Sequence, residues 1–195
     1  MNIYFDCEFT GLEQDCDLIS IALISDCGKR FYFEFNDFCK DNLNEWIKDN
    51  VIKHLSFNGH DKYIPKHSIA DCTSYAAKGD KRMCREYLNI WLGQFDEDIQ
   101  FVSDVCHYDF VLLIDLICGH ALRLPANISP ACLDINQTIA DYHKISLREA
   151  FNISREEILS NNSVEINGNK HNSLYDAKVI KTIYNILVLK EETLC

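Results

Sequence analysis

Residues 3–12, Ile3-Tyr4-Phe5-Asp6-Cys7-Glu8-Phe9-Thr10-Gly11-Leu12, join an apolar strand to two acids and a glycine turn. The β-branched and aromatic residues at the start favour a strand. Asp6 and Glu8 are two residues apart, so in a strand both carboxylates point to the same face. A divalent cation that prefers oxygen ligands, Mg²⁺ or Mn²⁺, would relieve their repulsion. The alternative is a pair of solvated acids at a strand end, and the downstream sequence decides between the two.

Length and composition predict one globular domain over residues 1–195. The chain has 195 residues, of which 47% are hydrophobic and 25% charged, as in ordinary soluble proteins. It does not begin with a basic segment followed by an apolar run, so we expect no signal peptide. Its longest apolar run, 110–114, is too short to span a membrane. We therefore expect a cytoplasmic protein with no membrane partner.

Cysteines and net charge narrow the class of protein further. The 10 cysteines include no C-x-x-C pair and no zinc-finger spacing, which favours reduced thiols. The net charge of −11 argues against a binder that holds nucleic acid on a basic surface. It is compatible with an enzyme that meets phosphate through bound metal ions, because the ions reverse the local charge.

Apolar runs separated by turn residues predict an α/β fold with a five-stranded mixed sheet. The first three strands follow one another closely and are expected to form an antiparallel meander. The later strands alternate with helices, which predicts parallel pairing and helices on both faces of the sheet. The four expected strands after the first are 18–25, 30–35, 100–105 and 131–135.

Hydrophobic spacing also predicts the helices and loops between these strands. The expected helices are 43–55, 80–95, 110–118, 136–143, a turn at 146–151, and 173–191. In the first of these, the apolar residues at helical spacing are Leu43, Trp46, Ile47, Val51 and Leu55. Two polar stretches, 56–79 and 161–172, are expected to be loops.

A basic face on the 80–95 helix is the main cationic feature of this acidic chain. Lys81, Arg82 and Arg85 recur at helical spacing beside the apolar stripe. We expect these residues to contact substrate phosphates, in the same subunit or across a homodimer. The alternative is a solvated basic face without a ligand.

Further candidate residues follow the fourth strand and open the last helix. Asp109 follows the fourth strand, Asp176 lies in the first turn of the last helix, and His171 precedes that turn. If the first and fourth strands are parallel neighbours, their carboxyl ends meet at the edge where open α/β sheets bind ligands. Acids at this edge could hold two ions for phosphoryl transfer, and a histidine could take the proton of the attacking water. The alternative for His171 is a solvated side chain. Asp134 is expected to cap a helix, and the alternative for it is a supporting acid of the site.

Three motifs in this order resemble those of the DEDDh 3′–5′ exonuclease superfamily. DCEFTGL, HYDF and HNSLYDA match its three exonuclease motifs in sequence, over most of the chain. The superfamily includes ribonuclease T, oligoribonuclease, the proofreading subunit of bacterial replicative polymerase and poly(A)-specific ribonuclease. Residues 18–55 look closest to a mycobacterial-type 3′–5′ exoribonuclease subfamily. The resemblance implies an RNase H-like fold and two divalent cations, Mg²⁺ or Mn²⁺.

The resemblance also implies roles for individual residues. The acids that would bind metal and act in catalysis are Asp6, Glu8, Asp109 and Asp176, with His171 as general base. The residues that would contact the terminal nucleotide are Phe9, Thr10, Gly11, Leu12 and Tyr108. Asn172 stands where the related DEDDy branch has Tyr, which favours the His branch. Val105 departs from the pattern, because the family often has Asn at this position.

These features together predict a metal-dependent exoribonuclease that works from the 3′ end. It would hydrolyse single-stranded RNA or 3′ overhangs to nucleoside monophosphates, by a two-metal mechanism with a histidine base. Nucleic acid is thus the expected partner, with RNA favoured over DNA on the resemblance alone. Two alternatives stay open, a DNA 3′–5′ exonuclease and a catalytically idle nucleic-acid-binding protein of the same fold.

Overall fold

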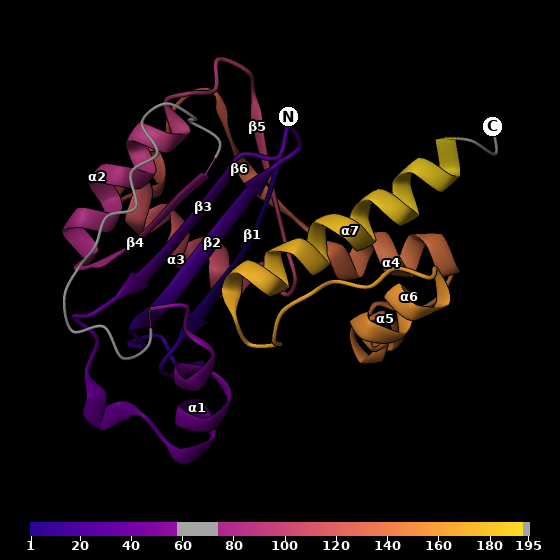
Figure 1. The fold of residues 1–195 in the computed structure, drawn as a ribbon. Coiled ribbons are helices and arrows are strands. Elements are labelled where there is room, and N and C mark those ends of the chain that lie inside the picture. The colour runs from indigo at the N-terminus through magenta and orange to yellow at the C-terminus, as the bar shows by residue number, and fades with distance from the viewer. Residues whose placement is uncertain (58–73, 193–195) are drawn as a thin grey trace.

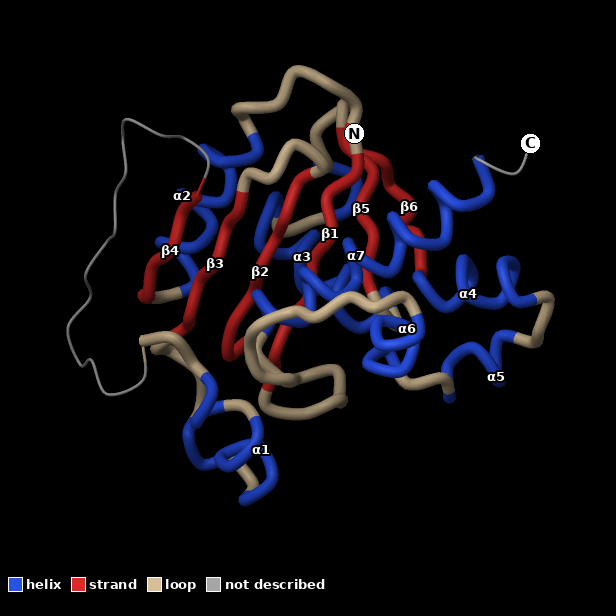
Figure 2. Tube along the Cα trace, turned by 45° about the vertical axis from the view of Figure 1, so that its right-hand side comes forward, coloured by secondary structure: helices blue, strands red, loops and turns tan. Residues whose placement is uncertain are grey.

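A six-stranded mixed sheet forms the centre of the molecule in a computed structural model that describes residues 1–57 and 74–192 (Figure 1). Its strands are β1 (Asn2–Phe9), β2 (Leu18–Ser25), β3 (Arg30–Phe35), β4 (Ser74–Gly79), β5 (Ile99–Ser103) and β6 (Ile128–Asp134). Their order across the sheet is β4-β3-β2-β1-β5-β6, so β1 lies at the centre (Figure 2).

Strand directions confirm the predicted arrangement around β1. β1 pairs antiparallel with β2, and β2 pairs antiparallel with β3, which gives the expected meander. β5 pairs parallel with β1, and β6 pairs parallel with β5. The carboxyl ends of β1 and β5 therefore meet at one edge of the sheet, as the position of Asp6, Glu8 and Asp109 required.

The prediction of five strands is wrong, because β4 adds a sixth at the edge of the sheet beside β3. β4 lies within the predicted loop 56–79, and residues 58–73 of that loop lie outside the described residues. Its sequence, SYAAKG, is short and rich in small residues, so it lacks the apolar alternation that marks a strand. As an edge strand it pairs with β3 alone, in parallel register.

Helices cover both faces of the sheet, as predicted. α2 (Lys81–Leu92) and α3 (Cys106–Cys118) pack on one face, against a core that contains Ile3 and Phe5 of β1. α4 (Ile135–His143) and α7 (Ser173–Glu192) pack on the other, against a core that contains Tyr4 of β1 (Figure 1). Because side chains alternate along a strand, Asp6 and Glu8 share the α7 face with Tyr4.

Three short helices differ from the predicted boundaries. The expected helix 43–55 is replaced by α1 (Glu45–Asn50) and a 3₁₀ turn, Ile52–His54. The Asn44 side chain caps α1 by accepting a hydrogen bond from the Ile47 amide. The helix therefore begins at Glu45, two residues after the predicted start. α5 (Leu147–Asn152) agrees with the expected helical turn at 146–151 to within one residue at each end, and α6 (Arg155–Asn161) was not predicted.

Two expectations about the chain's surroundings can be compared with the described residues. No helix among them is both long and apolar enough to cross a membrane. The eight cysteines within the described ranges are free thiols, in agreement with the expected reduced state.

Candidate active site

A cleft of about 1120 Å³ lies at the carboxyl ends of β1 and β5. Its floor includes residues of β1 and the first turns of α7, and its walls come from α1, the β5–α3 turn and the α5–α6 corner. α1 and α5 lie on opposite sides of this edge in both views (Figures 1 and 2). The cleft therefore stands where the ligands of open α/β sheets bind.

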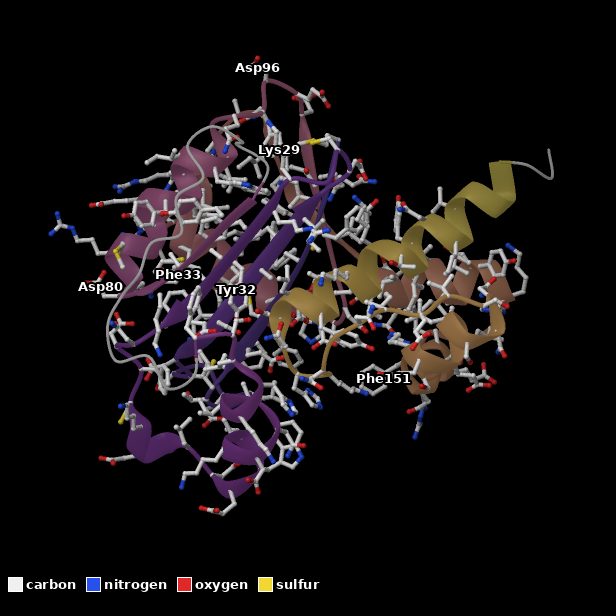
Figure 3. The ribbon with its side chains drawn as sticks, viewed as in Figure 1. Lys29, Tyr32, Phe33, Asp80, Asp96 and Phe151 are labelled. Atoms are coloured by element: carbon white, nitrogen blue, oxygen red, sulfur yellow. The ribbon has the colours of Figure 1, made fainter. Side chains whose placement is uncertain are left out.

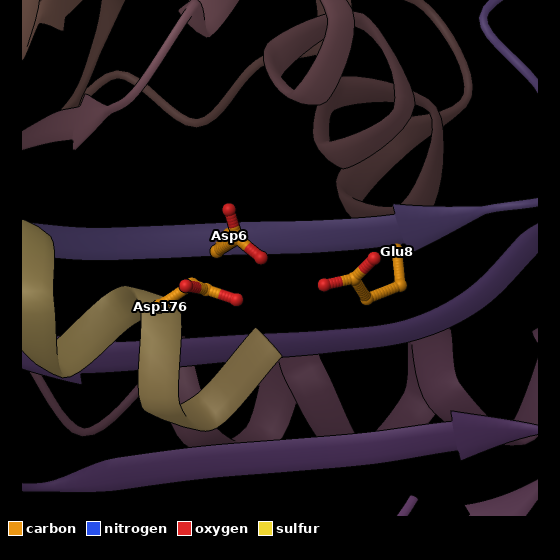
Figure 4. A group of neighbouring side chains, drawn as sticks. All are labelled: Asp6, Glu8 and Asp176. Carbon is orange, nitrogen blue, oxygen red and sulfur yellow. The ribbon is translucent and has the colours of Figure 1, made fainter. Parts of the chain in front are cut away.

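Three of the predicted acids converge at this floor. Asp6, Glu8 and Asp176 each offer a carboxylate oxygen, and these oxygens all lie within 4.8 Å of one another. Figure 4 shows Asp6 and Glu8 projecting from the strand toward Asp176, which the last helix supplies. The strand period places the first two on one face, and α7 packs across β1 and β2 to bring the third. Three oxygen donors at this spacing fit a hard divalent cation.

The raised pKa values of these acids show that burial and mutual repulsion disfavour their ionised forms. Burial, followed by the charges of Asp176 and Asp109, raises the pKa of Glu8 to about 9. Burial raises the pKa of Asp176 to about 7. The pKa of Asp6 is raised well above its usual value by burial and then by Asp176 and Asp109. A bound cation would favour the ionised carboxylates, so the group fits a metal site.

Asp109 lies beside these three acids but is engaged within the fold. Its Oδ1 accepts a hydrogen bond from the Cys7 amide at 2.9 Å, and its Oδ2 accepts one from the Ser103 hydroxyl at 3.4 Å. Burial raises its pKa to about 7, although the Cys7 and Ser103 contacts oppose the shift. Asp109 therefore fixes the end of β1 between the two metal-site candidates Asp6 and Glu8, and also lines the cleft.

His171 stands at the mouth of the same cleft and is tied to Asp176. Its backbone amide donates to Asp176 Oδ2 at 2.8 Å, and its backbone takes a left-handed conformation with φ 62°. Burial, then the charges of Lys170 and His54, lower the pKa of the imidazole. The neutral form is thus favoured at neutral pH, which is the form that can accept a proton.

Aromatic and amide contacts hold this histidine loop in place. The Trp46 ring packs edge-on against the His171 ring, with centroids 4.9 Å apart. Asn172 donates to the His54 carbonyl oxygen at 2.8 Å and accepts from the Leu174 and Tyr175 amides, so it caps α7. Trp46 is 54% exposed and lines the cleft, whereas Ile47 and Val51, which share its predicted helical spacing, are buried.

An ion-pair network supports the turn that precedes Asp109. Arg155 donates to both carboxylate oxygens of Asp104, at 2.7 and 2.9 Å, and to Asn136 Oδ1 at 2.6 Å. The next residue, Val105, has φ 54°, a left-handed conformation that is unfavourable for a β-branched side chain. Asp134 caps α4 through the Asn136 amide and accepts from the Cys106 amide, as its predicted structural role requires.

The predicted substrate-binding residues do not all reach the cleft. Phe9, Gly11, Leu12 and Tyr108 line it, with Leu12 65% and Tyr108 42% exposed. Thr10 is buried and instead closes the loop after β1, by accepting from the Asp17 amide at 3.0 Å. Gly11 is not among the glycines with positive φ, so the turn there does not need a glycine conformation.

The basic face of α2 contacts α3 and does not line the cleft. Arg85 donates to the carbonyl oxygens of Leu116 and Asp115, and Lys81 forms an ion pair with Asp115. Arg82 pairs with Glu86 on the same helix. These contacts favour the structural alternative over phosphate binding, since Lys81 and Arg85 neutralise the carboxyl end of α3 and Arg82 pairs within α2.

Several cleft residues carry no signal in the motifs. These are Trp46, Phe151, Arg155 and Lys170. Trp46 and Phe151 lie on short helices whose packing cannot be read from periodicity. Lys170 is adjacent to His171 and pairs with Glu156 at 3.5 Å. Its position next to the candidate base was a signal in the sequence, but Arg155 could be found only from the fold.

Comparisons with known proteins place this architecture among solved exonucleases. Searches found no matching family model and no matching curated protein. Among solved structures, Pop2p of S. pombe in an Mg²⁺- and Mn²⁺-bound form matches with a TM-score of 0.57 and 13% identity, over 94% of this chain and 81% of that one. A full-length 3′-exonuclease matches with a TM-score of 0.61 and 11% identity, over 97% and 82%.

A third structure, a 3′-exonuclease described with a histone mRNA stem-loop, has a TM-score of 0.61 and 12% identity. The match covers 97% of this chain and 63% of the chain of that structure. At such low identities the likeness concerns the fold, and the cleft described above is independent of it. The chain has the RNase H-like exonuclease fold, an α/β architecture with six strands in place of the five that the sequence predicted.

Proposed function

We propose that this chain is a metal-dependent 3′–5′ exonuclease of the DEDDh type, built as one domain, with RNA as its substrate. The observation that carries the proposal is the meeting of Asp6, Glu8 and Asp176 within 4.8 Å, in a cleft that also holds His171. Two acids from β1 and one from α7 have no structural need to lie together, because their charges repel.

Asp6, Glu8 and Asp176 would hold two divalent cations, Mg²⁺ or Mn²⁺, with Asp109 as the fourth acid of the site. The Mg²⁺- and Mn²⁺-bound form of Pop2p supports this choice of metals. When bound, such ions polarise the phosphodiester and stabilise the attacking and leaving oxygens. The protein's own contribution is a fixed set of oxygen donors, supported by the Asp109 contact to the Cys7 amide.

His171 is the proposed general base. Its lowered pKa keeps the imidazole neutral, so it can take the proton of the attacking water. The hydrogen bond from the His171 backbone amide to Asp176 sets where the imidazole stands relative to the acids, and the Trp46 ring limits its rotation.

The terminal nucleotide is proposed to lie against Phe9, Gly11, Leu12 and Tyr108, which line the cleft next to the acids. Thr10 does not line the cleft, but its hydroxyl oxygen holds the adjacent loop by accepting a hydrogen bond from the Asp17 amide. Exposed apolar and aromatic side chains tolerate any base, which suits stepwise release of nucleoside monophosphates from an unpaired end. Lys170 is the cation best placed for a backbone phosphate, because Arg155 already uses its donors within the fold.

Two alternatives differ in what they expect from the cleft. A DNA 3′–5′ exonuclease would use the same acids, and RNA is preferred because one structural neighbour is described with a histone mRNA stem-loop. An idle nucleic-acid-binding protein would gain nothing from three repelling carboxylates. A mycobacterial-type specificity, a homodimer and a cytoplasmic location stay predictions.

The proposal is tested with a 5′-labelled single strand, as RNA and as DNA, in the presence of Mg²⁺ or Mn²⁺. The wild type should produce a ladder that shortens from the 3′ side, faster on RNA. Asp6→Asn should abolish the ladder, and His171→Ala should slow it about 10²–10⁴-fold. Calorimetric titration with Mn²⁺ should show binding to His171→Ala, since the histidine is not a ligand. Internal cuts, or normal turnover by Asp6→Asn, would contradict the assignment.

A further inference from the structure

The α5–α6 corner forms a wall of the cleft that none of the sequence motifs includes. Residues 151–156 line the cleft together with the metal-site acids. Phe151, near the end of α5, is 59% exposed. Figure 3 shows its side chain projecting from α5 on the side that faces the start of α7 and α1. A large aromatic ring thus stands uncovered by the described residues, inside the space where substrate is proposed to lie.

This corner is rigid, because Arg155 closes it internally and binds it to two other segments. Its Nη1 donates to the carbonyl oxygens of Ala150 and Ile153 at 3.1 and 2.8 Å, across the turn between the two helices. The Nε and Nη2 donors bind Asp104 and Asn136, in the β5–α3 turn and α4. All five guanidinium donors are therefore used. The backbone beside Phe151 is held to the turn that carries the second motif.

The start of α5 is fixed as well. Ser146 and Glu149 form a reciprocal capping box, with the Ser146 hydroxyl accepting from the Glu149 amide and Glu149 accepting from the Ser146 amide. A ring carried by a helix fixed at both ends loses little freedom when a flat ligand stacks on it. The arrangement therefore suits a preformed stacking surface more than a mobile cover.

We propose that Phe151 is a stacking platform for a base upstream of the 3′-terminal nucleotide. The inference rests on the proposed function and adds a second contact region to it. The terminal nucleotide is assigned to the residues that directly follow Glu8, whereas Phe151 belongs to the separate wall after α5. A strand that occupies both must extend along the cleft, so the substrate is single-stranded nucleic acid longer than the terminal unit. Affinity should therefore rise with length until the strand reaches Phe151.

The experiment compares a minimal phosphodiester with oligonucleotides of increasing length. The p-nitrophenyl ester of thymidine 5′-monophosphate has no upstream base, so its hydrolysis reports the metal site alone. Phe151→Ala should leave this reaction unchanged and raise KM for long single strands about 5- to 100-fold, with kcat retained. Phe151→Leu should behave like Phe151→Ala, while Phe151→Tyr should restore the wild-type KM.

Leu147→Ala is the matched control. Leu147 lies on the same helix, is 54% exposed and does not line the cleft, so its removal should leave KM unchanged at every length. Single abasic substitutions then locate the stacked base. One abasic position should weaken binding to the wild type, and the same position should have no effect on Phe151→Ala.

The outcomes separate the two proposals. If the wild type hydrolyses both substrates but KM depends on length equally in the wild type and Phe151→Ala, the stacking platform is wrong and the exonuclease stands. The stacking platform is also wrong if Phe151→Ala only abolishes self-association of the protein, which would make Phe151 a contact between copies. If the wild type hydrolyses neither substrate with Mg²⁺ or Mn²⁺, the proposed function itself fails.

Discussion

Val105 is the residue whose backbone departs most clearly from its chemical preference. It precedes α3 with φ 54° and ψ 50°, and its side chain makes no capping hydrogen bond. Asn tolerates a left-handed backbone far better than a β-branched residue does. We expect Val105→Asn to raise the free energy of unfolding by about 1 kcal/mol. Urea denaturation of the metal-free protein measures the difference.

Val111→Asn provides the comparison for this substitution. Val111 lies on the same helix, is 66% exposed and is not among the residues with positive φ. The exchange of side chain is identical, and the backbone is left-handed at Val105 but not at Val111. If both variants change stability equally, the strain at Val105 is not real. A gain restricted to Val105→Asn supports it.

The residues that the sequence could identify are those placed by strand alternation or by the three motifs. Asp6 and Glu8 lie on one face because a strand alternates, and Asp176 lies beside them because the first turn of α7 crosses β1. Trp46 and Phe151 could not be placed in this way. Each belongs to a six-residue helix, too short for a hydrophobic stripe to fix its orientation.

At the scale of elements, the basic residues of α2 and of the loop before α7 differ in role. Those of α2 take part in packing, and the one before α7 is proposed to bind substrate. Lys81 and Arg85 neutralise the end of α3, whereas Lys170 lines the cleft. We expect Lys170→Gln to reduce the slope of log affinity against log salt by about 0.7, the effect of one lost phosphate contact on a single strand. Fluorescence anisotropy with a labelled oligonucleotide measures this slope.

The matched variant replaces Lys81, Arg82 and Arg85 together with Gln. Because these residues contact α3 and α2 itself, the salt slope should stay that of the wild type. Stability should fall by about 1 kcal/mol, chiefly through the lost Arg85 bonds to α3. A smaller slope of log affinity against log salt in this triple variant would instead show that these side chains contact substrate phosphates.

Two elements escaped prediction for different reasons. β4 has a weak strand signal because its edge position demands little apolar alternation, so only its pairing with β3 defines it. α6 did carry a local signal, since Ser154 caps it by accepting from the Glu157 amide. A serine followed three residues later by glutamate marks a helix start, and Ser146 and Glu149 repeat the pattern at α5.

At the scale of the whole molecule, the buried acids of the cleft make the free energy of unfolding depend on pH and on divalent metal. In an unfolded chain these carboxyls titrate near pH ~4. In the folded, metal-free protein the pKa values of Asp109 and Asp176 are about 7, and that of Glu8 is about 9. The folded state therefore holds more protons between these limits, so the free energy of unfolding falls as pH rises from about 4 to about 9.

Magnesium should offset this loss, because it binds the ionised carboxylates. We expect the Mg²⁺-dependent rise in Tm to be larger at about pH 8 than at about pH 5.5. Thermal unfolding followed by circular dichroism, with and without Mg²⁺, measures both values. Asp6→Asn should reduce the difference and also raise the metal-free Tm at high pH. An Mg²⁺ effect that is equal at both pH values would contradict the shared site.

The acids of the floor come from distant parts of the chain, and this has a consequence for biosynthesis. Glu8 leaves the ribosome 168 residues before Asp176 does (176 − 8). At ordinary rates of translation, about 5–20 residues per second, this interval lasts roughly 8–34 s. Throughout it the nascent chain presents β1 without its third carboxylate. The proposed exonuclease activity therefore cannot arise before α7 has been made, so the nascent chain cannot degrade its own messenger until then.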